Sequence, residues 1–240
     1  MKKLGFLLLL GSAVPAVAAD LPASVSAPKA DEAVYDWSGL YAGALVGYGI
    51  GASGAEGEAS SFDGSAPDDR ADVDPEGFLG GAVAGYNWQF KQFVYGLEAE
   101  VGYLGANDDF YWPDGNDYFG DVEYGAYGSL AARFGVAFDK SLFTAKAGAI
   151  LADVDYGYGD LDGSSTSFYA DSSASVFGGD ARLGILVGAS FERVIQDGWM
   201  ARVGYSYANF GSHTEFDTGG SSYKISDDLH MVHVGLTKQF

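Results

Sequence analysis

The histidines of this 240-residue chain are the first candidates for chemistry. His230 and His233 could bind a metal ion. On a strand, however, residues three apart point to opposite faces and cannot bind one ion together. His213 precedes the carboxylates of Glu215 and Asp217 in a serine-rich stretch, a combination that could support hydrolysis or acyl transfer. A loop histidine beside carboxylates is more commonly only solvated, so we expect no catalytic site and no metal site.

A glycine motif is the next candidate. The spacing G-x-G-x-x-G occurs at Gly49, Gly51 and Gly54. A dinucleotide site would need a helix directly after these glycines, with its N-terminus at the pyrophosphate. Residues 55–74 are instead an acidic stretch without helical periodicity, so we interpret the motif as the base of a loop and expect no cofactor.

Acidic residues gather in three segments, 56–74, 108–121 and 153–162. None follows an EF-hand loop, because the terminal glutamate is missing. We interpret the segments as solvated surface. The alternative is diffuse binding of Ca²⁺ or Mg²⁺ that bridges to lipopolysaccharide phosphates. The formal charge of −20 argues against nucleic acid, whose phosphates need a basic surface.

The elements that position these residues show the two-residue period of β-strands. Residues 78–88 alternate between an apolar face and a glycine-rich face, and the alternation resumes over residues 93–103 after a short connection at Lys91. Runs of this length joined by a tight turn predict an antiparallel hairpin. Aromatic residues lie at both ends of the apolar face, as they do on strands that cross a bilayer.

The same pattern predicts eight strands. Three of their connections are short, near Lys91, near Ser141 and at 194–198. The four others are long, at 51–75, 104–121, 153–175 and 209–228. Strict alternation of short and long connections is typical of an up-and-down barrel with periplasmic turns and extracellular loops. The fold class is therefore all-β, an eight-stranded antiparallel up-and-down transmembrane β-barrel.

The face without the apolar stripe is interpreted as the barrel interior. A soluble barrel would carry dense charge on that face. Here the charges are few and balanced, which suits a closed interior where each needs a partner. The middles of the apolar faces carry no charged residue. This suits a face in contact with lipid, where a charge would cost about 2–4 kcal/mol. The parity places Tyr124 outside and predicts an interior ionic network of Glu98, Glu100, Arg133, Lys146, Asp180, Arg182, Glu192 and Arg202. Eight strands leave an interior just wide enough for side chains, so no wide channel is expected.

The N-terminal residues predict export. Lys2 and Lys3 precede an apolar run and the small-residue site Ala16-Val17-Ala18. We interpret residues 1–19 as a signal peptide cut after Ala18 or Ala19, 20–36 as a flexible periplasmic lead-in, and 37–240 as the barrel.

Five stretches carry a resemblance to a known family: WSGLYAG at 37–43, GGAVAGYNWQ at 80–89, VYGLE at 94–98, RFG at 133–135 and VGLTKQF at 234–240. In these stretches the chain resembles the small porin-like outer-membrane proteins of alphaproteobacteria, within the eight-stranded group that includes the OmpA membrane domain. Ala131, Gly204 and Lys238 depart from the pattern. The resemblance implies that the barrel-assembly machinery recognises the terminal strand through Val232, Val234, Leu236 and Phe240.

Together these observations predict an integral protein of the cell outer membrane. Its expected role is structural, with porin-like passage of small solutes left open. The alternative is an adhesin-like binding module that uses its acidic extracellular loops on a host or envelope partner. Outer-membrane lipid and lipopolysaccharide are the expected surroundings, and no enzymatic activity is expected.

Overall fold

The computed structural model describes residues 34–57, 70–112, 118–160, 181–216 and 222–240, all within one compact unit, Ala33–Phe240. Within these ranges there is no helix with the length and hydrophobicity needed to cross a membrane. The described residues form nine antiparallel strands: β1 (Gly39–Gly57), β2 (Arg70–Val73), β3 (Glu76–Phe90), β4 (Phe93–Trp112), β5 (Tyr118–Phe138), β6 (Ser141–Asp160), β7 (Ala181–Gln196), β8 (Trp199–Phe216) and β9 (Ser222–Gln239).

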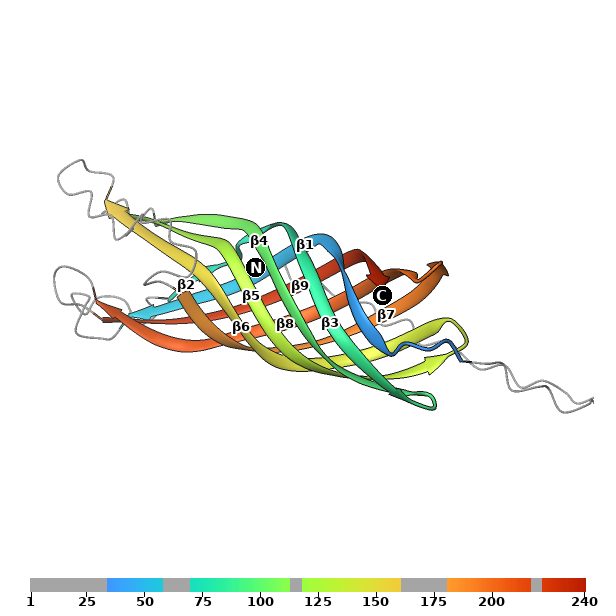
Figure 1. Ribbon diagram of the computed structural model, residues 1–240. Coiled ribbons are helices and arrows are strands. Elements are labelled where there is room, and N and C mark those ends of the chain that lie inside the picture. The colour runs from blue at the N-terminus through green and yellow to red at the C-terminus, as the bar shows by residue number, and fades with distance from the viewer. Residues whose placement is uncertain (1–33, 58–69, 113–117, 161–180, 217–221) are drawn as a thin grey trace, which may run out of the picture. The chain divides into compact units, whose positions relative to one another are not determined.

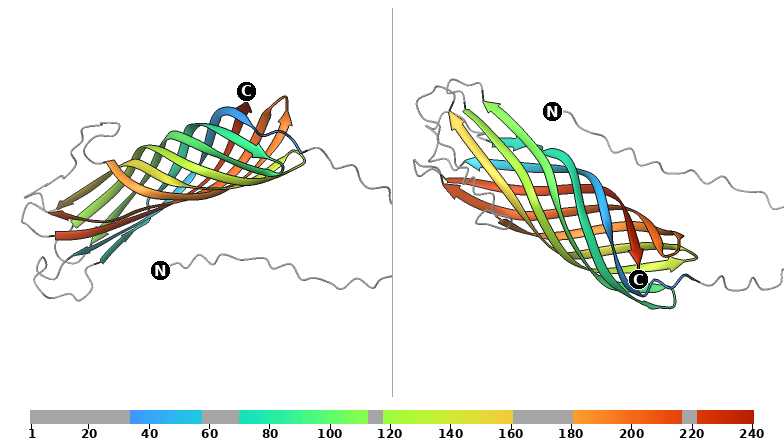
Figure 2. Two further views of the ribbon diagram at one scale, coloured as in Figure 1. Left: turned by 60° about the horizontal axis from the view of Figure 1, so that its bottom comes forward. Right: turned by 45° about the horizontal axis from the view of Figure 1, so that its top comes forward.

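These strands close into a barrel of eight positions. The order runs β1-β3-β4-β5-β6-β7-β8-β9, and β9 pairs back onto β1 (Figures 1 and 2). β2 and β3 pair with successive parts of β1 and share one position, interrupted at Pro75. Proline has no amide hydrogen to donate, but its carbonyl still accepts from the Gly51 amide at 2.7 Å. The predicted eight-stranded antiparallel barrel is confirmed.

Short turns join the strands at one end of the barrel. β3–β4, β5–β6 and β7–β8 are each joined by two residues, and Lys91, Asp139 and Asp197 have positive φ angles of 56°, 50° and 48°. Two-residue turns whose first residue has a positive φ angle match the right-handed twist of the paired strands. All three predicted short connections are found where the pattern placed them.

The strands continue further at the opposite end than the sequence predicts. Part of each expected loop is strand: β1 runs to Gly57, β4 to Trp112, β6 to Asp160 and β8 to Phe216 (Figure 1). Glycine and aspartate in these segments favour turns in isolation, but backbone pairing with neighbouring strands overrides that preference. Further parts of these loops belong to β2, β5 and β9, Asp74 and Pro75 connect β2 to β3, and residues 58–69, 113–117, 161–175 and 217–221 lie outside the described ranges.

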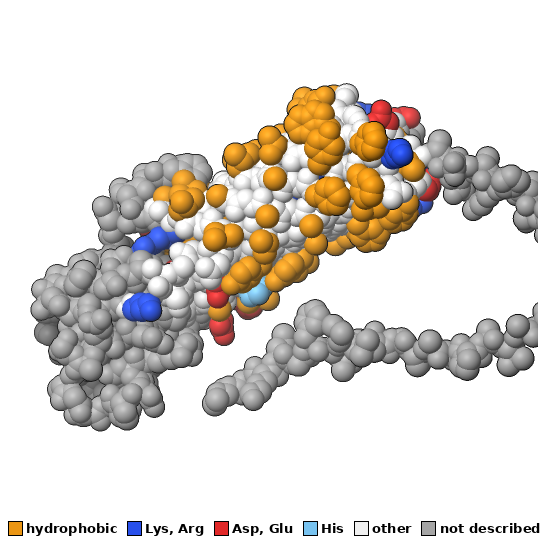
Figure 3. Space-filling view, turned by 90° about the horizontal axis from the view of Figure 1, so that it is seen from below, with side chains coloured by type: hydrophobic (Ala, Val, Ile, Leu, Met, Phe, Trp, Pro, Cys, Tyr) orange, Lys and Arg blue, Asp and Glu red, His pale blue; other side chains and the backbone are white. Residues whose placement is uncertain are grey.

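The two faces of the wall differ as the parity predicts. Leu97 is 51% exposed on the outside, whereas the next residue, Glu98, is 3% exposed inside. Figure 3 shows hydrophobic side chains spread over the outer wall. Cross-strand aromatic pairs lie toward both ends of this apolar belt, with Trp88 stacked on Tyr95 near the short turns and Tyr48 edge-on to Phe78 at the far end.

One residue contradicts the parity. Tyr124 is 1% exposed and lies inside, so the outward prediction is wrong. The β5–β6 register shifts between Tyr124 and Tyr127, and the β4–β5 register shifts between Tyr103 and Asn107. A bulge adds a residue and exchanges the faces beyond it, which a strict two-residue period cannot show.

Candidate functional site

The structure brings six of the eight predicted interior residues together in the barrel. Each comes from an inward position of its strand, because alternate side chains of a strand share a face. We call these six residues the ionic cluster: Glu98 and Glu100 of β4, Arg133 of β5, Lys146 of β6, Glu192 of β7 and Arg202 of β8.

Glu98 lies at the centre of the ionic cluster and contacts three cations. Its Oε2 is 2.9 Å from Arg133 Nη1 and 2.8 Å from Arg202 Nη2. Its Oε1 is 3.1 Å from Lys146 Nζ. Glu192 completes the group, since its Oε1 contacts Arg133 Nη2 and lies 3.2 Å from Arg202 Nη2. Both arginines therefore bridge the same two carboxylates.

The charges of the ionic cluster balance. The cluster holds three carboxylates and three cations. Glu100 belongs to it because its Oε2 lies 3.3 Å from Lys146 Nζ. The side chains of Arg133, Arg202 and Glu192 are at most 2% exposed. A buried charge without a partner is strongly destabilising, so this balance is required for the interior to stay dry and packed.

Two tyrosines that the sequence analysis did not single out complete the cluster. Tyr41 donates to Glu98 Oε2 at 2.7 Å and accepts from Arg133 Nη1 at 2.6 Å. The guanidinium groups of Arg133 and Arg202 lie 5.2 and 5.6 Å from the Tyr41 ring centre. Tyr127 donates to Glu100 Oε1 at 2.8 Å. Tyr41 could have been identified from the sequence, because the odd-numbered residues of β1 face inward. The bulge in β5 hides the inward position of Tyr127 from the same reasoning.

The remaining predicted interior residues are not part of the ionic cluster. Arg182 lies at the start of β7, six residues before Gly188, which pairs with Lys146. This separation is roughly 20 Å along the strand. Asp180 lies outside the described residues.

The histidines point in different directions, as their spacing predicts. His230 is exposed on the outer wall, where its Nδ1 lies 2.6 Å from the Tyr205 hydroxyl. His233 is 4% exposed and faces inward. A Cβ at Gly204 would lie 2.4 Å from His233 Nε2, so the imidazole occupies the space that a larger residue at 204 would need. His213 and Glu215 belong to β8, but their side chains lie outside the described set, as does Asp217.

Lys238, another departure from the family pattern, lies at the short-turn end of β9. Its Nζ contacts the Asp197 carbonyl and lies 5.7 Å from the centre of the Trp199 ring. The charge therefore lies at the edge of the apolar belt, where a lysine can reach water.

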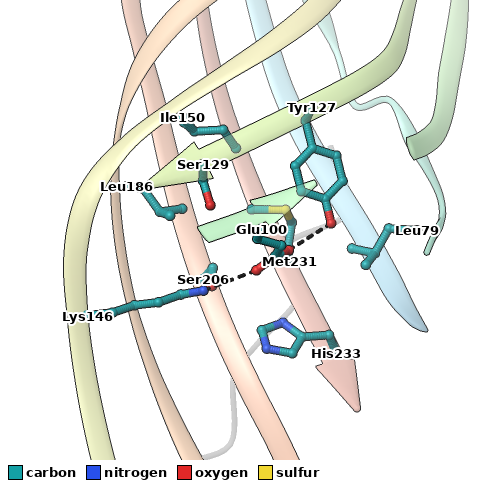
Figure 4. A pocket seen from close by; sticks show the side chains of 10 residues that line it. All are labelled: Leu79, Glu100, Tyr127, Ser129, Lys146, Ile150, Leu186, Ser206, Met231 and His233. Atoms are coloured by element: carbon teal, nitrogen blue, oxygen red, sulfur yellow. Dashed lines mark hydrogen bonds and ion pairs between the residues drawn. The ribbon is translucent and has the colours of Figure 1, made fainter. Parts of the chain in front are cut away.

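A small pocket borders the ionic cluster but leaves no room for a water molecule. In Figure 4 the Glu100 carboxylate lies between the Tyr127 hydroxyl and the Lys146 ammonium, with His233 nearby. The side chains that line the pocket are Leu79, Glu100, Tyr127, Ser129, Lys146, Ile150, Leu186, Ser206, Met231 and His233.

Apolar residues lie on both sides of the ionic cluster along the barrel. The inward positions of β6 run from Leu142 through Lys146 to Ile150, and those of β4 run from Val94 through Glu98 to Leu104. These four apolar side chains are at most 2% exposed. The glycine-rich interior expected from the sequence is thus wrong in part, because leucine and isoleucine fill it above and below the charges.

Comparisons with known proteins agree with this architecture, although no family model matches the chain. The chain is 30% identical to the 22 kDa outer membrane protein of Rhizobium leguminosarum bv. viciae over 206 residues, 85% of this chain and 78% of that protein. It is 29% identical to the 25 kDa outer-membrane immunogenic protein of Brucella canis over 216 residues, 90% of this chain and 85% of that protein. Among solved structures, the outer membrane protein OprG from Pseudomonas aeruginosa is similar with a TM-score of 0.51 at 11% identity, covering 85% of this chain and 97% of that one.

Proposed function

Because the chain belongs to the family of small outer-membrane β-barrel proteins of alphaproteobacteria, we propose that it is a closed barrel that strengthens the cell envelope and carries no solute current. The protein is located in the outer membrane, where its apolar belt contacts lipid and lipopolysaccharide. The proposal concerns what the barrel does there.

The packed interior is the observation that carries this proposal. The ionic cluster fills the lumen at one level, apolar side chains fill it above and below, and the pocket beside the cluster has no space for water. An ion crossing this interior would have to displace paired charges and then pass through apolar layers. Both steps are costly in free energy.

Planar-bilayer recording tests the proposal. The refolded full-length protein is expected to insert without producing stable current steps in concentrated potassium chloride, while a water-filled porin in the same bilayer produces them. Insertion is verified separately by protease protection in vesicles. Reproducible unitary steps from the purified protein would overturn the closed-barrel proposal and favour the porin-like alternative.

Surface binding is a second candidate function, supported by the length of the strands. The β1–β9 pairing continues from Ile50↔His230 to Gly57↔Tyr223, and Ile50 is the last large hydrophobic residue exposed among the described side chains of β1. This wall would project from the membrane toward host or envelope partners. Grafting the β1–β9 extension onto an unrelated eight-stranded barrel should transfer cell adhesion if this alternative is correct.

Assembly of the barrel would use its terminal strand. Val232, Val234 and Leu236 are each about half exposed on the outer face of β9, and Phe240 follows at the short-turn end. We propose that the barrel-assembly machinery recognises these side chains. A metal site at His230 and His233 is not proposed, since these two histidines lie on opposite faces of the wall.

A further inference from the structure

The residues directly before β1 cross the short-turn mouth of the barrel. β6 is the fourth neighbour of β1 in either direction around the ring, so the β5–β6 turn lies opposite β1. The Tyr35 amide nevertheless donates to the Asp139 carbonyl in that turn at 2.9 Å. From Gly39 back to Tyr35 the chain can span roughly 13–14 Å. We call residues 35–38 the strap.

The strap is also bound to two other sides of the mouth. The Trp37 amide donates to Gln89 Oε1 near the end of β3 at 2.6 Å. The Gln239 side chain of β9 donates to the carbonyls of Asp36 at 3.0 Å and Ser38 at 2.6 Å. Hydrogen bonds from three separate parts of the ring thus fix the path of four residues. This arrangement differs from a chain that merely leaves the barrel.

The Trp37 side chain is the most deeply buried part of the strap. It is 1% exposed and meets the Tyr35 ring edge-on at 5.4 Å. Its Nε1 is buried without a hydrogen-bond partner among the described residues, which is unfavourable by itself. The indole is therefore held in place by the burial of its ring and by the hydrogen bonds of the strap backbone.

Burial of the neighbouring interior residues indicates that this end is covered. Val94, Leu142 and Met200 are the first inward apolar residues after the short turns, and they are 1%, 0% and 2% exposed. In a tube with an open end, the last inward side chains would meet water. Among the described residues, the strap is the segment that crosses this end.

We propose that the strap is a built-in lid and that Trp37 closes the periplasmic mouth of the barrel independently of the ionic cluster. The proposal extends the closed barrel proposed above and assigns a sealing role to a segment outside the strands. Two barriers then lie in series along the lumen. Loss of the lid opens the mouth to water. The ionic cluster, and the apolar layer of Leu104 and Ile150 beyond it, still close the lumen.

Cysteine accessibility tests the lid, because the chain has no cysteine of its own. Met200→Cys places a single thiol inside the mouth, and a charged, water-soluble methanethiosulfonate reagent reports its exposure in the refolded full-length protein. Adding Trp37→Ala should make the thiol react about tenfold faster, since labelling follows the population of the open form. Trp199→Ala is the matched control, because Trp199 lies at the same end but is 44% exposed on the outer wall.

The possible results distinguish a failure of the lid proposal from a failure of the closed-barrel proposal. An unchanged labelling rate in Trp37→Ala, with folding verified by its heat-dependent mobility in gels, would overturn the lid. If Trp37→Ala does not fold, Gln239→Ala, which removes two hydrogen bonds to the strap, should accelerate labelling about fivefold, and no acceleration would overturn the lid. Current steps from the unaltered protein would refute the closed barrel, whereas the labelling comparison would still decide the lid.

Discussion

At the scale of single residues, the ionic cluster is centred on Glu98, whose carboxylate contacts Arg133, Lys146 and Arg202. The inward parity and the charge of Glu98 predict a buried ionic group. Parity alone could not indicate which partner each carboxylate meets. That choice depends on the stagger between strands and on the Tyr41 hydroxyl of β1, which lies 57 residues before Glu98 in the sequence.

Removing one cation should strongly destabilise the barrel. Arg133→Met leaves an excess negative charge among buried groups and is expected to lower the free energy of unfolding by about 3–5 kcal/mol. Arg133→Met combined with Glu192→Leu restores the charge balance and should recover much of that loss. Urea unfolding in lipid vesicles, followed by tryptophan fluorescence, measures both values.

The control for this prediction is Arg193→Met, because Arg193 is exposed on the outer face of β7. Arg193→Met should lower the free energy of unfolding by less than about 1 kcal/mol. Equal losses for Arg133→Met and Arg193→Met would contradict the importance assigned to the ionic cluster.

At the scale of the strands, the short turns and the faces of the wall follow from local pattern, whereas the strand ends do not. The residues beyond Ile50, Tyr103 and Leu151 carry the glycine, asparagine and aspartate that single segments use in loops. They become strands because neighbouring strands supply hydrogen-bond partners, both close in the sequence, as for Trp112 and Tyr118, and far away, as for Gly57 and Tyr223. The bulge between Tyr124 and Tyr127 is hidden for the same reason.

Close approach of two strands gives a prediction at this scale. A Cβ at Gly43 of β1 would lie 2.1 Å from the Leu236 carbonyl oxygen and 2.6 Å from Thr237 Cα, both backbone atoms of β9. Gly43→Ala should therefore force β9 away from β1 and cost about 1–3 kcal/mol. The measurement is the urea midpoint of the refolded protein.

Gly80→Ala is the matched control, since the nearest atom to its Cβ would be the Leu45 carbonyl oxygen at 4.0 Å. It should leave the midpoint nearly unchanged. A shift as large as that of Gly43→Ala would show that close packing between β1 and β9 is not the cause.

At the scale of the whole molecule, the sequence predicts a membrane barrel because charge, apolar belt and connection lengths all agree. It does not predict the strap or the apolar layers of the interior. The strap depends on contacts between Trp37 and Gln89, and between Ser38 and Gln239, that no local period encodes. The apolar layers depend on which inward-facing residues of different strands lie at the same height along the barrel axis.

The position of the membrane around the molecule can be tested with a single charge. Ala147 faces outward in the middle of β6, and an arginine there should make insertion less favourable by about 2–4 kcal/mol. Ala52 is exposed on β1 beyond Ile50, and Ala52→Arg should cost about 0–1 kcal/mol. Reversible folding into vesicles compares the two, and equal costs would place the lipid belt elsewhere.

The pairing of β9 with β1 also constrains when the protein can fold. Ser38 and Gln239 are 201 residues apart, and the wall has two open edges until β9 pairs with β1. Each unpaired backbone group would cost several kcal/mol in hydrocarbon. A chain arrested before β9 therefore has no stable place in the bilayer, and the barrel cannot close until the last of its strands is available.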